Sequence, residues 1–195
     1  YIVVQESASM IPSVVLNPSG KDVVLDMSAS PGAKTTHLAQ IMKNKGVIVA
    51  NEKNYERITA LTSNLRRCGV LNTVVTLMDG REITEKFDKV LLDAPCSSSG
   101  TIRGLTKGSE FIAKSWNLER IKSTAGLQKK LILNAYNLMN KNGVLVYSIC
   151  SLEPEEGEEV IQFLEDWIKL EVAIEKVKQA DYDLNLLKQP NFGGV

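Results

Sequence analysis

The chain has few cysteines, and their arrangement excludes two common roles. Cys68, Cys96 and Cys150 form an odd, sparse set in 195 residues, without the short paired spacing of a zinc site. They are equally unlike the disulfide framework of a small secreted protein. The sequence therefore predicts a protein of a reducing compartment with no metal centre.

Long apolar runs and a leader segment are missing as well. No apolar run approaches the roughly 20 residues that cross a bilayer, and no basic segment followed by an apolar one opens the chain. We expect a soluble intracellular protein with no membrane partner. Position 1 is Tyr rather than Met, which indicates a fragment of a longer protein.

Net charge is also absent, since 23 basic residues balance 23 acidic ones. A nucleic-acid binder normally has a basic excess, because it neutralises phosphates. Residues 103–130 nevertheless have seven basic side chains against two acidic ones, and residues 152–175 have nine carboxylates against one lysine. We interpret the acidic segment as a solvated helix face. The basic segment remains open between a solvated surface and an RNA-binding one.

Two missing sequence motifs argue against two classes of enzyme. The single histidine, His37, has no serine or carboxylate signature around it, so hydrolase chemistry is unsupported. The glycine spacing Gly-x-Gly-x-x-Gly does not occur, which disfavours a cofactor held by its pyrophosphate and, with it, a nicotinamide-dependent oxidoreductase.

Short apolar runs rich in β-branched residues are present, and segments of helical period separate most of them. The expected strands are Val23–Asp26, Val47–Asn51, Thr73–Leu77, Lys89–Asp93 and Val144–Ser148. The expected helices are Thr35–Lys43, a segment from Ile58 to Cys68, Leu118–Met139, and Glu155–Ile168 with carboxylates at its N-terminus. The pattern predicts one α/β domain over residues 1–195, with a mostly parallel sheet covered by helices on both faces.

Two cysteines directly follow expected strands. Cys96 lies in Asp93-Ala94-Pro95-Cys96, and Cys150 lies in Ser148-Ile149-Cys150-Ser151. Open α/β sheets build their sites at the carboxyl ends of strands. One such cysteine is more often a core residue, but two favour covalent catalysis. Cys68 lacks this context and is assigned to the core.

The first expected strand leads into a segment with the strand, turn and helix order of a nucleotide-cofactor loop. Small residues permit a close backbone turn there, and helix N–H groups then point at whatever binds. Glu52 ends the second strand, where it can accept hydrogen bonds from ribose hydroxyls. Asp79 follows the third strand and could accept from an adenine amino group.

These stretches resemble the Nol/Nop/Sun family of RNA (cytosine-5) methyltransferases, from Gln5–Met10 to Ser151–Glu156. The resemblance implies a Rossmann-like methyltransferase fold, S-adenosyl-L-methionine as cofactor and RNA as substrate. The residues that it implies for the cofactor pocket are Ser28, Ala29, Ser30, Pro31, Gly32, Ala33, Lys34, Glu52, Arg57, Asp79 and Asp93.

The resemblance also implies catalytic roles. Cys150 is the nucleophile that adds to carbon 6 of cytosine, and Cys96 assists release of the methylated base. Asp93 would hydrogen-bond the nitrogen at position 3, and Lys34 would help orient the base. A nucleophilic thiol needs a lowered pKa, which the helix after Cys150 and Lys34 are expected to provide.

Within the family, four short stretches resemble the nucleolar large-subunit ribosomal RNA members. They are Asn51-Glu52-Lys53, Arg57, Asn72-Thr73 and Asp79–Glu82. It implies ribosomal RNA or a pre-ribosomal particle as partner. The protein would then be nucleolar in a eukaryote and cytoplasmic otherwise.

Two departures from the family pattern stand out. The family loop commonly has two glycines where this chain has Gly32-Ala33. If position 33 needs a positive φ, alanine costs about 1 kcal/mol or more there, and cofactor affinity falls. The family also closes its sheet with an antiparallel hairpin, and beyond an expected strand at Val172–Val177 the last strand is not recognisable.

Other function classes remain open. A ribosome-assembly factor could keep the fold and act mainly by binding RNA, although intact Lys34, Asp93, Cys96 and Cys150 argue against lost catalysis. A DNA methyltransferase would use the cysteine after proline, Cys96, as its nucleophile. The two-cysteine arrangement disfavours that class.

Overall fold

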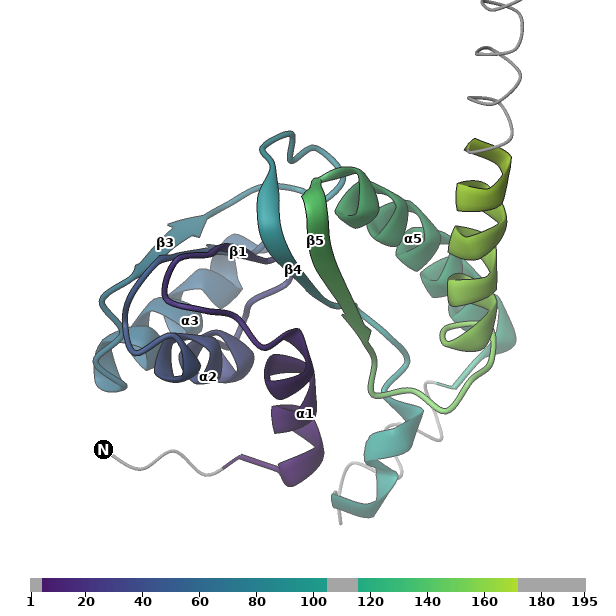
Figure 1. Cartoon of the computed structure of the whole chain (residues 1–195). Coiled ribbons are helices and arrows are strands. Elements are labelled where there is room, and N and C mark those ends of the chain that lie inside the picture. The colour runs from purple at the N-terminus through teal and green to yellow at the C-terminus, as the bar shows by residue number, and fades with distance from the viewer. Residues whose placement is uncertain (1–4, 105–115, 172–195) are drawn as a thin grey trace, which may run out of the picture. The chain divides into compact units, whose positions relative to one another are not determined.

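The structure is a computed structural model of the whole chain, and it describes residues 5–104 and 116–171 (Figure 1). The chain divides into two compact units, residues 1–160 and 161–195. The sheet and every site residue discussed below lie in the first unit. In the second, residues 161–171 are described and are helical. The expected strand at Val172–Val177 lies outside the described residues.

Within the described residues, five strands form one parallel sheet in the order β3-β2-β1-β4-β5. The strands are β1 (Val23–Asp26), β2 (Val47–Asn51), β3 (Thr73–Thr76), β4 (Phe87–Asp93) and β5 (Met139–Ser148). The chain builds outward from β1 to β3, then returns to the other side of β1 for β4. Open α/β sheets bind ligands beside this reversal, at the carboxyl ends of the strands.

The apolar runs form strands because their side chains are buried on both faces. Val90, Leu91 and Leu92 of β4 are consecutive and fully buried, as expected for a parallel sheet between helical layers. The predicted α/β fold is therefore confirmed. Several boundaries differ from the expected ones by one to three residues, and the largest difference is that β5 already begins at Met139 rather than at Val144. The step from Met139 to Val144 opposes the shorter step from Phe87 to Lys89, so the residues between Met139 and Val144 form a bulge inside the strand.

Helices cover both faces of the sheet, with α1, α2 and α3 on one side and α5 on the other (Figure 1). Their bounds are α1 Ser7–Leu16, α2 Ala33–Ile41, α3 Tyr55–Arg67 and α5 Leu118–Asn137, and a 3₁₀ segment, η1, covers Ser99–Gly104. The side chains of Asn54 and Asn117 cap α3 and α5 by accepting the N–H groups of Glu56 and Glu119. Gly69, at φ 66°, follows the end of α3 in the left-handed conformation that often ends a helix.

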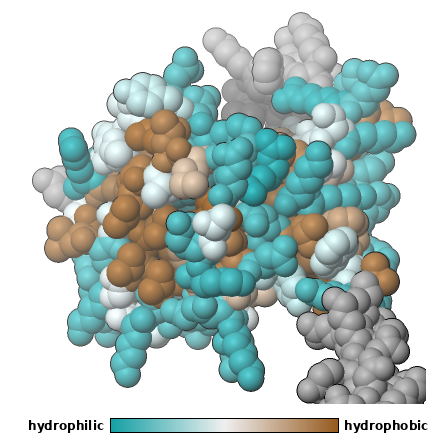
Figure 2. Space-filling view, turned by 90° about the horizontal axis from the view of Figure 1, so that it is seen from above, coloured by the Kyte–Doolittle hydropathy of each residue, from teal (hydrophilic) through white to brown (hydrophobic). Residues whose placement is uncertain are grey.

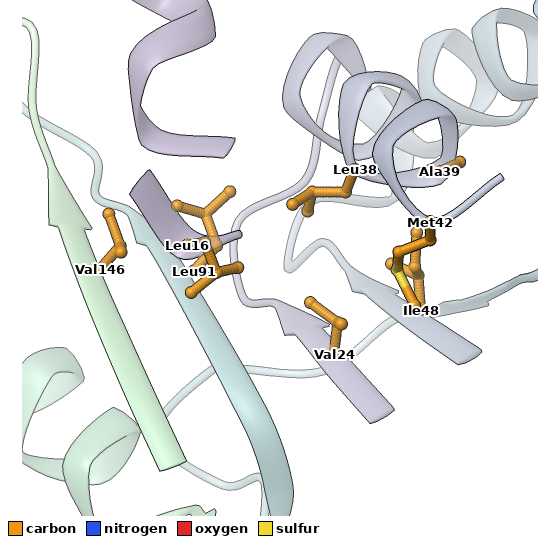
Figure 3. Packing of buried hydrophobic residues seen from close by; sticks show 8 residues of the cluster. All are labelled: Leu16, Val24, Leu38, Ala39, Met42, Ile48, Leu91 and Val146. Carbon is orange, nitrogen blue, oxygen red and sulfur yellow. The ribbon is translucent and has the colours of Figure 1, made fainter. Parts of the chain in front are cut away.

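Helix α1 was not expected from the sequence, because Pro12 lies inside it and removes a helical N–H. Tertiary packing explains why it forms. Leu16 is fully buried and joins Val24, Leu38 and Leu91 in the main apolar cluster between α1, α2 and the sheet (Figure 3). Burial of a leucine side chain contributes about 2 kcal/mol, which offsets much of the proline penalty.

The surface is mixed in character. On the face shown in Figure 2, apolar side chains gather toward one side, and hydrophilic ones cover most of the remainder. Among the described residues, no helix combines the length and the apolar character needed to cross a membrane.

Candidate active site

A pocket of about 820 Å³ opens at the carboxyl ends of the strands. Eight of the residues predicted for the site line it, namely Ser28, Ser30, Glu52, Arg57, Asp79, Asp93, Cys96 and Cys150. We call Glu52 and Asp79 its acidic end, and Cys96 and Cys150 its thiol end. The remaining predicted residues, Ala29, Pro31, Gly32, Ala33 and Lys34, lie in the loop and helix behind the lining.

The loop after β1 turns at Gly32, which has φ 104° and is the N-cap residue of α2. A side chain there would be strained, and an added Cβ would lie 3.1 Å from Leu61 Cδ1. Ala33 is the first helical residue and is not among the residues with positive φ. The backbone strain considered above for an alanine at position 33 therefore does not arise, because the residue with the left-handed conformation is Gly32.

Side chains from neighbouring elements fix this loop. Arg57 Nη2 donates to the Ser30 carbonyl oxygen at 2.6 Å, and Ser30 Oγ donates to the Arg57 carbonyl oxygen at 2.9 Å. Thr35 Oγ1 donates to Asp26 Oδ2 at 2.7 Å beneath the turn. Burial raises the pKa of Asp26 to about 7, although the Thr35 hydrogen bond opposes this.

At the acidic end, Glu52 is buried, with 5% of its surface exposed. Its Oε1 accepts the Asn54 N–H at 2.8 Å. Its Oε2 is buried without a hydrogen bond from the described residues, although Arg57 Nη1 lies 3.5 Å away as an ion-pair partner. An unmet buried acceptor costs free energy, so this oxygen is suited to a donor from a bound ligand.

Asp79 has a different environment, because the side chains of Lys53 and Arg81 contact its two carboxylate oxygens. Lys53 Nζ lies 2.6 Å and Arg81 Nη2 2.5 Å from Oδ2, and Arg81 Nε donates to Oδ1 at 2.9 Å. The hydrogen bonds from Arg81, and then those from Lys53, hold the pKa of Asp79 well below its usual range. Asp79 is therefore ionised, and a ligand amino group would have to share it with these two cations.

At the thiol end, Cys96 Sγ and Cys150 Sγ lie 3.1 Å apart, and the Cys150 N–H donates to Cys96 Sγ at 3.3 Å. The hydrogen bond from Cys96 lowers the pKa of Cys150 to about 6, with smaller contributions from Ser98 and Lys34, while burial and Asp93 oppose it. Donation to Cys150 raises the pKa of the Cys96 thiol. The pair therefore favours a thiolate on Cys150 and a thiol on Cys96.

The source of this activation differs in part from the expected one. The helix after Cys150 begins only at residue 158, and the largest cause of the lowered pKa is the neighbouring thiol. Lys34 contributes as expected. Cys68 is the C-cap residue of α3 and does not line the pocket.

Asp93 lies between the two ends, and both of its carboxylate oxygens are fixed. Lys34 Nζ donates to Oδ2 at 2.7 Å, and Ser148 Oγ donates to Oδ1 at 2.6 Å. The Asp93 side chain is 35% exposed, so the carboxylate still reaches the pocket. Ser148 was not predicted to have this role, although it stands two residues before Cys150 in the recognised stretch.

Sequence reasoning missed several lining residues. Asn51, 1% exposed, donates to the Met27 and Met78 carbonyl oxygens at 3.1 and 3.0 Å and so connects the ends of β1 and β3. Leu127 and Leu131 of α5 form an apolar wall. Their four-residue spacing could have indicated this role, because residues four apart lie on the same side of a helix. That side is next to the one that packs on the sheet.

Comparisons with known proteins show the family of the chain. The family model described as 16S rRNA methyltransferase RsmB/F matches residues 13–189. A tRNA (cytosine(49)-C(5))-methyltransferase from Pyrococcus abyssi is 48% identical over 180 residues, which cover 91% of this chain and 56% of that protein. Ribosomal RNA small subunit methyltransferase F from Vibrio parahaemolyticus is 43% identical over 169 residues, which cover 84% of this chain and 34% of that protein.

Solved structures match as well. The crystal structure of NSun6 from Pyrococcus horikoshii with SFG superposes with a TM-score of 0.76 and 39% identity, covering 83% of this chain and 41% of that one. An S-adenosylmethionine-dependent O-methyltransferase from Thermotoga maritima shares the fold, with a TM-score of 0.61 and 18% identity over 85% of this chain and 51% of that one. The present chain thus spans between a third and just over half of the curated relatives described above.

Proposed function

The chain belongs to the RsmB/F family of 16S rRNA methyltransferases, and from that premise we propose that it transfers a methyl group to carbon 5 of a cytosine in RNA. The family and the fold imply S-adenosyl-L-methionine as the cofactor. The observation that carries the proposal is the close contact of Cys96 and Cys150 at a pocket whose other end has a buried carboxylate.

The acidic end fits this cofactor. Glu52 Oε2 lacks a hydrogen-bond donor among the described residues, and a ribose hydroxyl would supply one. Ser28 and Ser30, on the loop before α2, and the ionised Asp79 line the same pocket. When bound, the cofactor supplies an electrophilic methyl group on a sulfonium. Glu52, Asp79 and this loop would hold it.

The thiol end supplies the activation that cytosine needs. Carbon 5 is a weak nucleophile, and addition of the Cys150 thiolate to carbon 6 makes it an enamine able to attack a methyl group. Asp93, whose carboxylate oxygens accept from Lys34 and Ser148, would in its protonated form donate to the nitrogen at position 3 and pass that proton to the ring as the thiolate adds. In the second half, water or a pocket side chain acting as a base takes the proton from carbon 5, and Asp93 takes back the proton on nitrogen 3. The bond from carbon 6 to Sγ breaks with its electron pair returning to Cys150 as the thiolate. We assign Cys96 to assist that step.

The RNA substrate is part of the proposal. The relatives are named for tRNA and for small-subunit ribosomal RNA, so both classes are candidates here. The finer expectation of a nucleolar large-subunit enzyme, a pre-ribosomal partner and nucleolar localisation rests on four short stretches and stays a prediction, as does a single domain over residues 1–195. Of the basic segment, Lys107 and Lys114 lie outside the described residues, and Lys122 is exposed on α5.

The test is methylation of RNA by the full-length protein. Purified enzyme, labelled S-adenosyl-L-methionine and separate tRNA and ribosomal RNA fractions should yield 5-methylcytosine at a defined position in one fraction. The Cys150→Ala variant should yield none. RNA binding without any label incorporation would overturn the proposal in favour of an assembly factor. Dependence on Cys96 alone would indicate the chemistry of DNA methyltransferases.

A further inference from the structure

Glu156 is a buried carboxyl group that the proposed reaction does not use. Its exposed fraction is 0%, whereas Glu158 and Glu159 nearby are exposed. The interpretation of residues 152–175 as a solvated face was therefore wrong for Glu156. It was also expected in the first turn of a helix, but the helix begins at residue 158. Its burial must have another cause.

The carboxyl group of Glu156 accepts hydrogen bonds from the loop after β4. The Ser97 N–H donates to its two oxygens at 3.0 and 3.1 Å, and Ser97 Oγ donates to Oε2 at 2.6 Å. The carbonyl oxygen of Glu156 accepts the Tyr147 hydroxyl of β5 at 2.6 Å. One residue thus connects the segment after β4 with strand β5 and the segment that follows it.

Further hydrogen bonds join the same two segments. Ser151 Oγ lies 3.0 Å from Ser97 Oγ and 3.3 Å from Ser99 Oγ. Ser99 Oγ accepts the Leu152 N–H at 2.9 Å, and the Gly100 N–H donates to the Cys150 carbonyl oxygen at 3.0 Å. Among these groups Glu156 is fully buried and accepts from both the backbone and the side chain of Ser97. Its loss would leave the Ser97 N–H without these acceptors, while Ser97 Oγ would keep Ser151 Oγ as its neighbour.

These contacts are adjacent to the thiols. Ser97 directly follows Cys96, and Ser151 directly follows Cys150. A carboxyl group that fixes Ser97 against the segment after Cys150 therefore also fixes the 3.1 Å separation of the two sulfur atoms. Loop residues are otherwise the most mobile part of a fold, and a hydrogen bond between thiols fails if they separate by 1 Å.

We propose that Glu156 is a positioning residue that keeps Cys96 within hydrogen-bonding distance of Cys150. As a role in methyl transfer, this rests on the proposed function. The effect on the thiols themselves does not, because their geometry and reactivity exist without RNA. Glu156 does not line the pocket and so acts through Ser97 and Cys96.

The first test measures thiol reactivity in the full-length protein. Glu156→Ala removes both acceptors of Ser97, whereas Glu156→Gln keeps one carbonyl oxygen in place. The exposed Glu158→Ala is the matched control. Alkylation of the Cys150 peptide by iodoacetamide, followed by mass spectrometry across pH, should show a midpoint about two pH units higher in Glu156→Ala and therefore a rate at pH 7 about tenfold lower. Glu156→Gln should fall between, and Glu158→Ala should match wild type.

The second test uses RNA. If Cys96 is displaced in Glu156→Ala, the variant should accumulate a covalent protein–RNA adduct, as Cys96→Ala should, while S-adenosyl-L-methionine binds normally. A role confined to folding would lower the melting temperature without an adduct. A folded Glu156→Ala protein with the wild-type alkylation profile would overturn the inference. If that variant does not fold, the same result with Glu156→Gln and Ser97→Ala together would do so.

The two proposals fail differently. If the wild-type protein methylates no RNA but its Cys150 alkylation depends on Glu156, the proposed function is wrong and the inference about Glu156 stands. If methylation depends on Cys150 and Glu156 has no effect on alkylation or adduct, the inference alone is wrong. Lys34 and Asp93, which also face Cys150, are unchanged in every variant.

Discussion

The acidic end and the thiol end of the pocket are built in different ways. At the acidic end, Glu52 directly follows β2 and Asp79 lies three residues after β3, and each has a partner two residues away in sequence, Asn54 or Arg81. At the thiol end, Cys96 and Cys150 come from loops 54 residues apart, and side chains from both loops hold them together. The first end combines these local contacts with one ion pair between Lys53 and Asp79, 26 residues apart, whereas the contact between the two thiols depends entirely on the tertiary fold.

The comparison predicts that substitutions at one end of the pocket leave the function of the other end unchanged, so cofactor binding and thiol reactivity can be disrupted separately. The largest effect is expected from Cys150→Ala, which should lower methyl transfer about 10⁴-fold or more, because no other group replaces the nucleophile. Binding of S-adenosyl-L-methionine, measured by titration calorimetry, should stay within about twofold of wild type. Loss of cofactor binding in this variant would show that the two ends are coupled.

At the acidic end, Glu52→Gln should weaken S-adenosyl-L-methionine binding about tenfold to a hundredfold. A neutral amide replaces a charged acceptor, and hydrogen bonds to charged groups contribute about 1.5–3 kcal/mol. Alkylation of Cys150 should not change. The exposed Glu56→Gln, four residues along the chain, is the control. An unaltered dissociation constant in Glu52→Gln would exclude Glu52 from the cofactor site.

The pH dependence of the thiol end gives a sharper test. The Cys96 hydrogen bond is the largest cause of the lowered Cys150 pKa of about 6. Removing it in Cys96→Ala destabilises the thiolate, so the pKa should rise toward the usual value for cysteine. The alkylation rate of Cys150 at pH 7 should then fall about tenfold. Cys68→Ala should leave the profile unchanged, and a profile that Cys96→Ala also leaves unchanged would contradict the thiol pairing.

The smallest effects concern the turn after β1. Gly32→Ala should lower the free energy of unfolding by about 1 kcal/mol or more, because a Cβ is strained at positive φ. The reciprocal Ala33→Gly should bring no gain in cofactor affinity and a loss of stability of up to about 1 kcal/mol, since Ala33 is helical. Chemical denaturation and cofactor titration of both variants check this. A gain in affinity for Ala33→Gly would contradict the helical assignment of residue 33.

The difference between the two ends of the pocket also explains which features of the fold and the site could be predicted from the sequence. The strands were predictable because Val90, Leu91 and Leu92 form an unbroken apolar run. The acidic residues were predictable because each lies within two residues of the end of an expected strand, Glu52 after Val47–Asn51 and Asp79 after Thr73–Leu77. Helix α1 was not, since only the tertiary burial of Leu16 explains a helix that contains Pro12.

The contacts that support the thiol end could not be predicted from the sequence, for a related reason. Both cysteines could be recognised from their local stretches, but the lowered pKa of Cys150 depends on a sulfur atom 54 residues away. Glu156 lies in a run of carboxylates that all look alike in the sequence. Only the fold distinguishes the one that accepts from Ser97.

The most direct test of the covalent role of Cys150 is the identity of the trapped residue. RNA that the wild-type protein methylates, prepared with 5-fluorocytosine at the target position, cannot lose a proton from carbon 5 and should hold the enzyme as a covalent adduct. Protease digestion and mass spectrometry should then find the nucleotide on the peptide that contains Cys150. A nucleotide attached to Cys96, or no adduct on an RNA that is otherwise methylated, would contradict the account.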